Sequence, residues 1–189
     1  MALIKDDPTP RLAARIRAQR QARGWSLDAF ARASGVSKAM LSKIERGEAS
    51  PTAALLGRIS GALGLTLSSL LADPADASGR LVRAAEQPTW RDPATGYVRR
   101  QLSPLSHSPL QLVEVQLPAR KTVRFPASAY AFLHQLIWVI SGTLTFIEGS
   151  VTHVLQPGDC LELGEPADCA FRNRSAKACR YLVAVWRRG

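Results

Sequence analysis

The chain has 189 residues, of which 46% are hydrophobic, and it carries a formal net charge of +10 with a pI near 10.4. This length allows two small domains with separate cores, and the composition indicates a globular protein and excludes a disordered one. No apolar run approaches the roughly 20 residues that span a bilayer, so the basic charge favours nucleic acid over a membrane as partner.

The start of the chain and its cysteines indicate the compartment. The first residues, MALIKDDPTPR, lack the basic-then-apolar order of a signal peptide, so we expect a cytoplasmic protein. Cys160, Cys169 and Cys179 are odd in number and form no CxxC pair, which predicts free thiols in a reducing compartment.

The first part of the chain has apolar residues at helical spacing and is the more basic part. Residues 1–72 carry a net charge of +6, and residues 73–189 carry +4. Ser26, Ser37 and Ser50 stand where helix N-caps are expected, and Pro51 takes the first helical position after Ser50. With Gly24, Gly35, Gly47 and Gly64 as breaks, the pattern predicts helices at about 8–23, 27–33, 37–45, 52–63 and 67–71.

Segment 27–46, LDAFARASGVSKAMLSKIER, predicts two short helices that cross tightly. Gly35 lies in the turn between them, and Phe30, Val36, Leu41 and Ile44 supply the apolar faces that lock the pair together. The remaining side chains form one exposed face, small at its start and basic farther along, which suits a DNA major groove about 12 Å wide. This face consists of Ser37, Lys38, Ala39, Ser42, Lys43 and Arg46.

Residues 11–71 resemble the phage-repressor-like (XRE) helix-turn-helix family. The resemblance rests on RxxRGWSLDAFA, on GVSKAMLSKIERGEASP and on ALGLTLSSLL, and it implies a recognition helix at about 37–45. One departure is Leu27, where many members carry Gln. The resemblance implies base contacts from Lys38, Ala39, Ser42 and Lys43, and phosphate contacts from Ser26, Ser37 and Arg46. The alternative is a small helical domain whose exposed Lys and Ser side chains only face solvent.

Beyond a linker-like stretch at 71–80, the pattern changes to short runs of β-branched and aromatic residues. The runs at 110–117, 143–148 and 179–186 are separated by turn signals such as Pro157-Gly158-Asp159, which predicts an antiparallel sandwich or barrel. We therefore expect a multidomain chain with a helix-turn-helix domain at 8–72, a linker and approach to the barrel at 73–96, and a β-domain at 97–187.

The β-domain resembles a cupin in HQLIWVISGTLTF (134–146), LQPGDCLEL (155–163) and Asn173. This resemblance implies that the five predicted helices, as a bundle, are followed by a double-stranded β-helix that binds an effector. The positions that hold metal ligands in many cupins fall on or next to Ser128 and Tyr130, and on Gln135 and Cys169. Because an amide and a lone thiol suit a divalent ion poorly, we predict no metal, no other cofactor and no catalytic residue. A shifted register would instead bring His134 and Cys169 together as a residual metal site.

A small organic effector is the ligand that we expect in the barrel. The predicted contacts are Tyr130, Gln135, Cys169, Arg124 and Trp138, and His107 and His153 are expected to be surface residues in turns. The alternative is a passive barrel that is filled by its own side chains and serves only for dimerisation.

The two resemblances together imply a transcriptional regulator, most often a repressor, that acts as a homodimer on a palindromic operator in double-stranded DNA. Effector binding would act on DNA binding through the 72–80 connector. The rival interpretations are a metal-dependent cupin enzyme with a DNA-binding appendage and a DNA-binding protein with a passive barrel.

Overall fold

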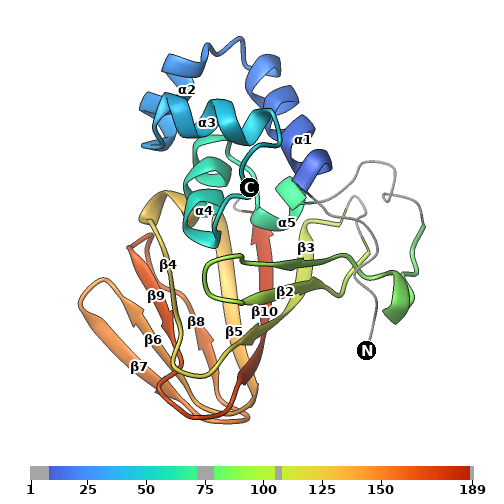
Figure 1. The fold of residues 1–189 in the computed structure, drawn as a ribbon. Coiled ribbons are helices and arrows are strands. Elements are labelled where there is room, and N and C mark those ends of the chain that lie inside the picture. The colour runs from blue at the N-terminus through green and yellow to red at the C-terminus, as the bar shows by residue number, and fades with distance from the viewer. Residues whose placement is uncertain (1–8, 72–78, 105–107, 188–189) are drawn as a thin grey trace.

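A computed structural model describes residues 9–71, 79–104 and 108–187. Helices come first and antiparallel strands follow (Figure 1), which confirms the predicted fold class. The predicted connector at 72–80 lies mostly outside the described residues, as does His107. The helices are α1 (Thr9–Ala22), α2 (Leu27–Ser34), α3 (Lys38–Glu45), α4 (Ala53–Ala62) and α5 (Leu67–Leu71).

Side-chain caps fix where three of these helices begin. The Ser26 hydroxyl accepts a hydrogen bond from the Ala29 amide at 3.1 Å, and the Ser37 hydroxyl accepts one from the Met40 amide at 3.3 Å, as predicted. The prediction for Ser50 is wrong. Helix α4 begins two residues later than that prediction requires, because Thr52 supplies the capping hydroxyl, at 3.4 Å from the Leu55 amide.

The predicted helix pair has the expected core. Phe30, Val36, Leu41 and Ile44 are each at most 3% exposed. Gly35 ends α2 with a φ of +65°, and its amide donates to the Ala31 carbonyl at 2.9 Å. A side chain at this position would strain the left-handed backbone, so glycine suits the turn that reverses the chain toward α3.

The strands form two antiparallel sheets. One has the order β1-β2-β3-β10-β5-β8 and the other the order β4-β9-β6-β7. The strands are β1 (Thr89–Arg91), β2 (Val98–Gln101), β3 (Leu110–Leu117), β4 (Thr122–Phe125), β5 (Leu133–Ser141), β6 (Leu144–Glu148), β7 (Val151–Leu155), β8 (Cys160–Glu162), β9 (Cys169–Arg172) and β10 (Cys179–Arg187).

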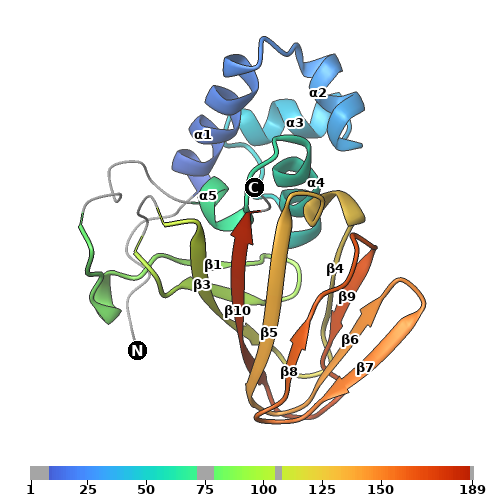
Figure 2. The ribbon, with the colours of Figure 1, turned by 180° about the vertical axis from the view of Figure 1, so that it is seen from behind.

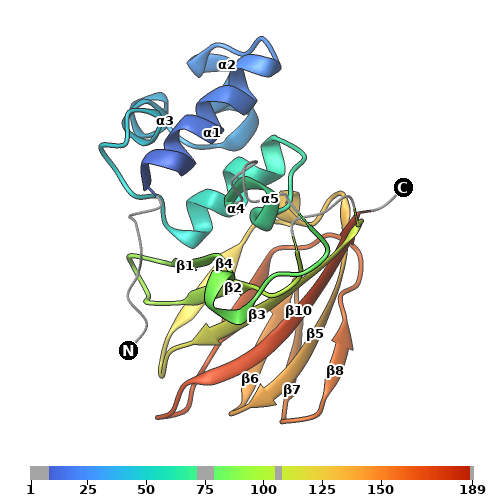
Figure 3. The same ribbon diagram turned by 90° about the vertical axis from the view of Figure 1, so that its right-hand side faces the viewer.

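The two sheets face each other (Figures 2 and 3), and aromatic side chains pack between them. Phe171 of the four-stranded sheet stacks on Tyr181 of the six-stranded sheet, with ring centroids 5.7 Å apart. Strands β3, β10, β5 and β8 opposite β4, β9, β6 and β7 make the eight-stranded double-sheet jelly roll to which cupins belong, so the predicted barrel is confirmed. Strands β1 and β2 extend the larger sheet beyond this barrel.

The helical domain rests on one end of the barrel through α4 and α5 (Figure 1). Helix α4 packs against β4 and the short 3-10 turn η3 (Ala127–Ala129), which precedes β5. A Cβ atom added at Gly57 would lie 2.6 Å from the Phe125 ring, and one added at Gly61 would lie 2.6 Å from the Ser128 carbonyl oxygen. Glycine therefore permits the close contact between the two domains.

Polar contacts add to this interface. The buried carboxylate of Asp92 accepts a hydrogen bond from the Ala53 amide at the start of α4, at 3.1 Å. On α5, Ser68 accepts from Arg99 at 3.0 Å, and the hydroxyl of nearby Thr66 contacts the Gln111 side chain at 2.9 Å. The two domains are thus joined through side chains of β2, β3 and the β1–β2 turn.

Two further findings concern sequence predictions. His153 lies in β7, half-buried and stacked on Phe146 with ring centroids 6.4 Å apart, so its assignment to a turn is wrong. The predicted free thiols are confirmed, since Cys160, Cys169 and Cys179 form no disulfide.

None of the described helices is long and apolar enough to cross a membrane.

Candidate functional site

Helix α3 presents a continuous exposed face. Lys38, Ala39 and Lys43 are exposed and Ser42 is half-buried, while Leu41 and Ile44 on the opposite side are buried in the core. This division follows from helical spacing, because positions 38, 39, 42 and 43 repeat about every 3.6 residues. The predicted base-contacting side chains therefore share one face of one helix, next to two capped helix N-termini.

An ion pair between α1 and α3 holds that face in place. Arg20 donates from Nε and Nη2 to the two carboxylate oxygens of Glu45, at 2.7 and 2.8 Å, and its Nη1 donates to the Trp25 carbonyl at 2.7 Å. The two side chains are only 13% and 7% exposed. The hydrogen bond to Glu45 raises the pKa of the Arg20 guanidinium above its usual value. A bidentate arginine–carboxylate pair of this kind fixes the orientation of the two side chains as well as the distance between them.

The positioning role of Arg20 was not predicted from the sequence. Glu45 was noted only as part of the helix-turn-helix pattern, and Arg20 is 25 positions earlier. A weak signal was available, since the core residue Ile16 lies one turn before Arg20 and the core residue Ile44 directly precedes Glu45. The pairing of Arg20 with Glu45 nevertheless depends on how the two helices cross.

The three side chains that are predicted to contact DNA phosphates all make hydrogen bonds within the helical domain. The Ser26 and Ser37 hydroxyls cap α2 and α3, so they lie beside free backbone amides at two helix N-termini, where anions bind favourably. Arg46 follows α3, exposed, and donates to both carboxylate oxygens of Glu48 at 2.6 and 2.7 Å. It also contacts the Ser42 hydroxyl. The hydrogen bond from Arg46 lowers the pKa of Glu48.

Lys38 is the other basic residue of this face with a partner on its own domain. Its Nζ lies 2.8 Å from an oxygen of Asp28 on α2, and both side chains are more than half exposed. Exposed ion pairs contribute little stability, so Lys38 is free to exchange this partner for another anion at small cost.

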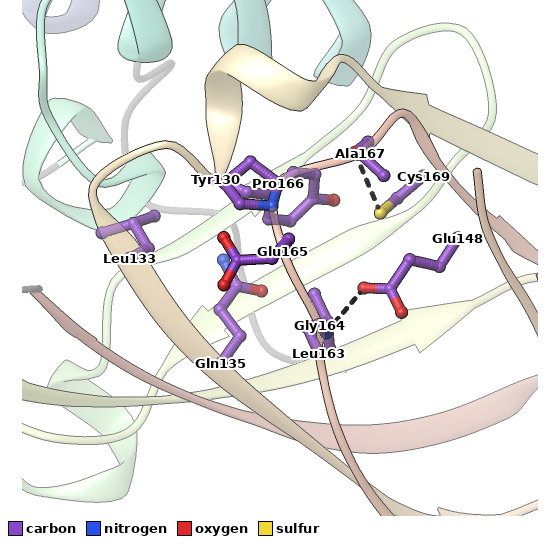
Figure 4. A pocket seen from close by; sticks show the side chains of 10 residues that line it. All are labelled: Tyr130, Leu133, Gln135, Glu148, Leu163, Gly164, Glu165, Pro166, Ala167 and Cys169. Carbon is purple, nitrogen blue, oxygen red and sulfur yellow. Dashed lines mark hydrogen bonds between the residues drawn. The ribbon is translucent and has the colours of Figure 1, made fainter.

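The barrel contains a small hollow between β5 and the segment that precedes β9 (Figure 4). Its volume is about 10 Å³, room for about one water molecule. Three of the predicted effector contacts line it, namely Tyr130, Gln135 and Cys169. The other lining residues are Leu133, Glu148, Leu163, Gly164, Glu165, Pro166 and Ala167.

The other two predicted effector contacts do not line this hollow. Arg124 is exposed on β4, between the buried Val123 and Phe125. Trp138 is 48% exposed on β5, and its indole nitrogen donates to the Gly158 carbonyl at 3.1 Å.

The thiol of Cys169, which lines the hollow, is weakly reactive. Burial, together with the negative charge of nearby Glu148, raises the pKa of the Cys169 thiol to about 12. The Cys169 sulfur donates to the Ala167 carbonyl at 3.3 Å, and Glu148 accepts from the Gly164 amide at 2.9 Å (Figure 4). A thiol with a raised pKa is a poor nucleophile and a poor metal ligand at neutral pH.

The metal-ligand positions of the cupin resemblance do not form a metal-binding set. Gln135 and Cys169 line the hollow, whereas His134 stacks on Trp186 with ring centroids 5.3 Å apart, on the opposite side of β5. Within residues 9–71, 79–104 and 108–187, no group of three or more His, Cys, Asp or Glu side chains is placed to hold a metal ion. These residues therefore do not fit a divalent metal of the cupin kind.

Comparison with known proteins identifies the helical domain. Residues 16–70 match the family model described as Helix-turn-helix (HTH_3). The HTH-type transcriptional regulator SutR of Escherichia coli (strain K12) is 51% identical over 59 residues, which are 31% of this chain and 33% of that protein. The chain thus matches about one third of the length of this relative.

Two solved structures extend the comparison beyond this domain. A crystal structure of an HTH_3 family transcriptional regulator from Vibrio cholerae is 27% identical, with a TM-score of 0.77, and the match covers 95% of this chain and 97% of that one. The cupin_2 domain of an XRE family transcriptional regulator from Enterobacter cloacae is 18% identical, with a TM-score of 0.44, over 48% of this chain and 95% of that one.

Proposed function

We propose that this chain, which carries an XRE-type helix-turn-helix domain and a cupin barrel, is a cytoplasmic transcriptional regulator that binds a specific DNA sequence. The observation that supports this most is the exposed face of α3, where Lys38, Ala39, Ser42 and Lys43 stand together on a helix that Arg20 and Glu45 hold in place. A helix with small and basic side chains on its outer face can enter the major groove and reach base edges.

Selection of bound sequences from random double-stranded DNA, at 100 to 200 mM salt, tests this function. We expect one enriched motif and a specific affinity at least 1,000-fold above that for scrambled DNA. The salt is fixed because the phosphate contribution falls steeply as ionic strength rises. Equal affinity for selected and scrambled DNA would contradict sequence-specific binding.

The proposed assembly is a homodimer through the barrels. The outer face of strands β3, β10 and β5 carries apolar side chains that are exposed or half-buried, and cross-strand pairing brings them into adjacent rows. The apolar residues of this face are Leu110, Leu112, Leu136, Trp138, Leu182, Ala184 and Trp186. A continuous exposed apolar patch is typical of a protein–protein contact, and a self-complementary patch gives a two-fold dimer.

Sedimentation velocity tests the dimer. Leu182→Glu places a charge in the middle of this face, so we expect it to convert a dimer to a monomer. Val154→Glu on β7 is the control, because Val154 is 60% exposed but lies on the other sheet. A monomeric wild-type protein would refute the proposal. For a dimer to place both copies of α3 in successive major grooves, they must lie about 34 Å apart, so we expect a palindromic operator with half-sites one helical turn apart.

The barrel is proposed to bind a small effector that changes DNA affinity. Support comes from the hollow and from its polar lining residues Tyr130, Gln135 and Cys169. A thermal-shift screen of metabolites tests it, since a ligand at 100 times its Kd adds about 2.7 kcal/mol to the free energy of unfolding. A broad screen in which no compound stabilises the protein would favour a passive barrel.

A metal-dependent cupin enzyme is the rival function, and the residues at the ligand positions give it little support. Elemental analysis of purified protein separates the two. We expect substoichiometric iron, manganese and zinc, and one metal ion per chain would favour the enzyme.

A further inference from the structure

A buried polar cluster lies on the inner face of the six-stranded sheet. Arg99 on β2 pairs with Val115, Val115 pairs with Tyr181, and Tyr181 pairs with Val139, so these four side chains form one row on the same face. The face is the inner one, because Val115, Tyr181 and Val139 are at most 1% exposed. Arg99 therefore directs a positive charge toward the inside of the sandwich.

Three tyrosines surround this charge. Burial raises the pKa of Tyr97, Tyr130 and Tyr181, and the positive charge of Arg99 opposes that rise at all three. Each tyrosine is at most 7% exposed. Their hydroxyls consequently stay protonated at neutral pH. Tyr97 hydrogen-bonds to Arg99 and Tyr130 to Cys169, whereas the Tyr181 hydroxyl has no partner among the described residues.

Two donors in this cluster have no acceptor. Among the described residues, neither Arg99 Nε nor the Tyr181 hydroxyl has a hydrogen-bond partner, although both atoms are buried. Arg99 donates from Nη2 to Ser68, and no carboxylate in the described part of the chain forms an ion pair with it. Arg99 is half-buried as a whole, but its Nε atom and the Tyr181 hydroxyl are buried, and buried donors are costly without an acceptor.

We propose that Arg99 and the hydroxyls of Tyr97, Tyr130 and Tyr181 bind the oxyanion group of a small effector. An oxyanion, whether a carboxylate or a sulfate-like group, supplies a negative charge beside Arg99 and acceptor atoms for Arg99 Nε and the Tyr181 hydroxyl. Of these four residues, Tyr130 also lines the hollow, which has room for about one water molecule, so an oxyanion binds only if the surrounding side chains move apart. Gln101, two residues along β2 from Arg99, also has a buried oxygen, Oε1, without a partner among the described residues.

The cluster is joined to the DNA-binding domain at two points. Arg99 holds Ser68 of α5, and Tyr130 directly follows the η3 turn against which Gly61 of α4 packs. An anion that draws Arg99 away from Ser68 would act on α5 directly. This inference depends on the proposal that the barrel takes an effector, but it does not depend on DNA binding.

Isothermal titration of the full chain with sodium formate, acetate, butyrate and sulfate tests the site, against sodium chloride at equal ionic strength. We expect saturable binding of at least one oxyanion and none of chloride. Tighter binding of formate or acetate identifies a carboxylate ligand, and tighter binding of sulfate identifies an inorganic oxyanion. The absence of saturable oxyanion binding would overturn the inference. If neutral compounds alone stabilise the protein in the metabolite screen, the effector proposal survives and this inference fails.

Single substitutions test whether these residues bind the oxyanion. Tyr181→Phe removes only the unpaired hydroxyl and keeps the ring that stacks on Phe171, so we expect an unchanged or higher Tm and at least a 5-fold higher Kd for the anion. Arg99→Gln should raise the Kd more than 10-fold. Arg172→Gln is the control, since this half-buried arginine follows Phe171 on the other sheet and points outward. Wild-type Kd values in both Tyr181→Phe and Arg99→Gln would also overturn the inference.

Discussion

Arg20 and Glu45 form a bidentate ion pair that joins the end of α1 to the end of the proposed recognition helix. Its two hydrogen bonds, from Arg20 Nε and Nη2 to the Glu45 carboxylate oxygens, are 2.7 and 2.8 Å long. Both side chains are largely buried. Removing one partner of such a pair leaves an uncompensated charge, so Glu45→Ala should lower the free energy of unfolding by about 3 kcal/mol. Urea unfolding measures this loss.

The double variant Arg20→Met with Glu45→Leu separates stability from positioning. Replacing both charges by apolar groups restores much of the lost stability, because no buried charge is left alone. DNA binding should stay weak if the pair orients α3. Glu48→Gln serves as the control, because Glu48 is exposed and should leave the urea midpoint unchanged. Full recovery of operator affinity in the double variant would mean that the pair only stabilises the domain.

The outer face of α3 gives the second prediction. Lys43→Ala or Ser42→Ala should weaken binding to the selected operator by about 1–3 kcal/mol, because each removes a proposed contact to a base edge. Binding to scrambled DNA should change little. Gel-shift titrations at one salt concentration measure both quantities.

Lys177→Ala is the matched control for Lys43→Ala. It removes one exposed lysine from a turn of the barrel, so it changes the net charge equally at a distance from α3. If Lys43→Ala and Lys177→Ala had the same effect on the operator and on scrambled DNA, the role of Lys43 would be only electrostatic.

The contact between Gly61 and the η3 turn gives the third prediction. A Cβ atom at this position would lie 2.6 Å from the Ser128 carbonyl oxygen, closer than two such atoms approach, so Gly61→Ala must displace α4 from the barrel. We expect a loss of about 1–3 kcal/mol in the free energy of unfolding, despite the higher helix propensity of alanine. Ala54→Ser, on the exposed side of α4, should be neutral. A more stable Gly61→Ala protein would show that the interface relaxes without cost.

Much of the fold follows from local signals. Ser26 and Ser37 predict the starts of α2 and α3, because a capping hydroxyl bonds only to amides two or three residues later. The same reasoning predicted the wrong start for α4 from Ser50, because Thr52 is also a good capping residue and directly precedes the helix. The run 110–117 predicts β3 with its observed bounds, because strand residues with alternating burial have a clear period.

The barrel interior was harder to predict because it depends on sheet register. Alternation along β5 places Gln135 inward and Trp138 outward, which explains why only the former lines the hollow. The cluster around Arg99 could not be predicted in this way. Arg99 and Tyr181 are 82 positions apart, and they share one row only because Val115 pairs with both.

The cysteines give the last prediction, on chemical reactivity. Cys160 is exposed, whereas Cys169 and Cys179 are at most 3% exposed. Burial raises the pKa of the Cys169 thiol to about 12 and that of Cys179 to about 11. Since the thiolate is the reactive form, iodoacetamide at pH 8 should alkylate Cys160 within minutes and the other two only after unfolding in urea. Peptide mass spectrometry measures each site. Cys160→Ser should abolish the fast phase, and rapid native-state alkylation of Cys169 would show that the hollow opens to solvent.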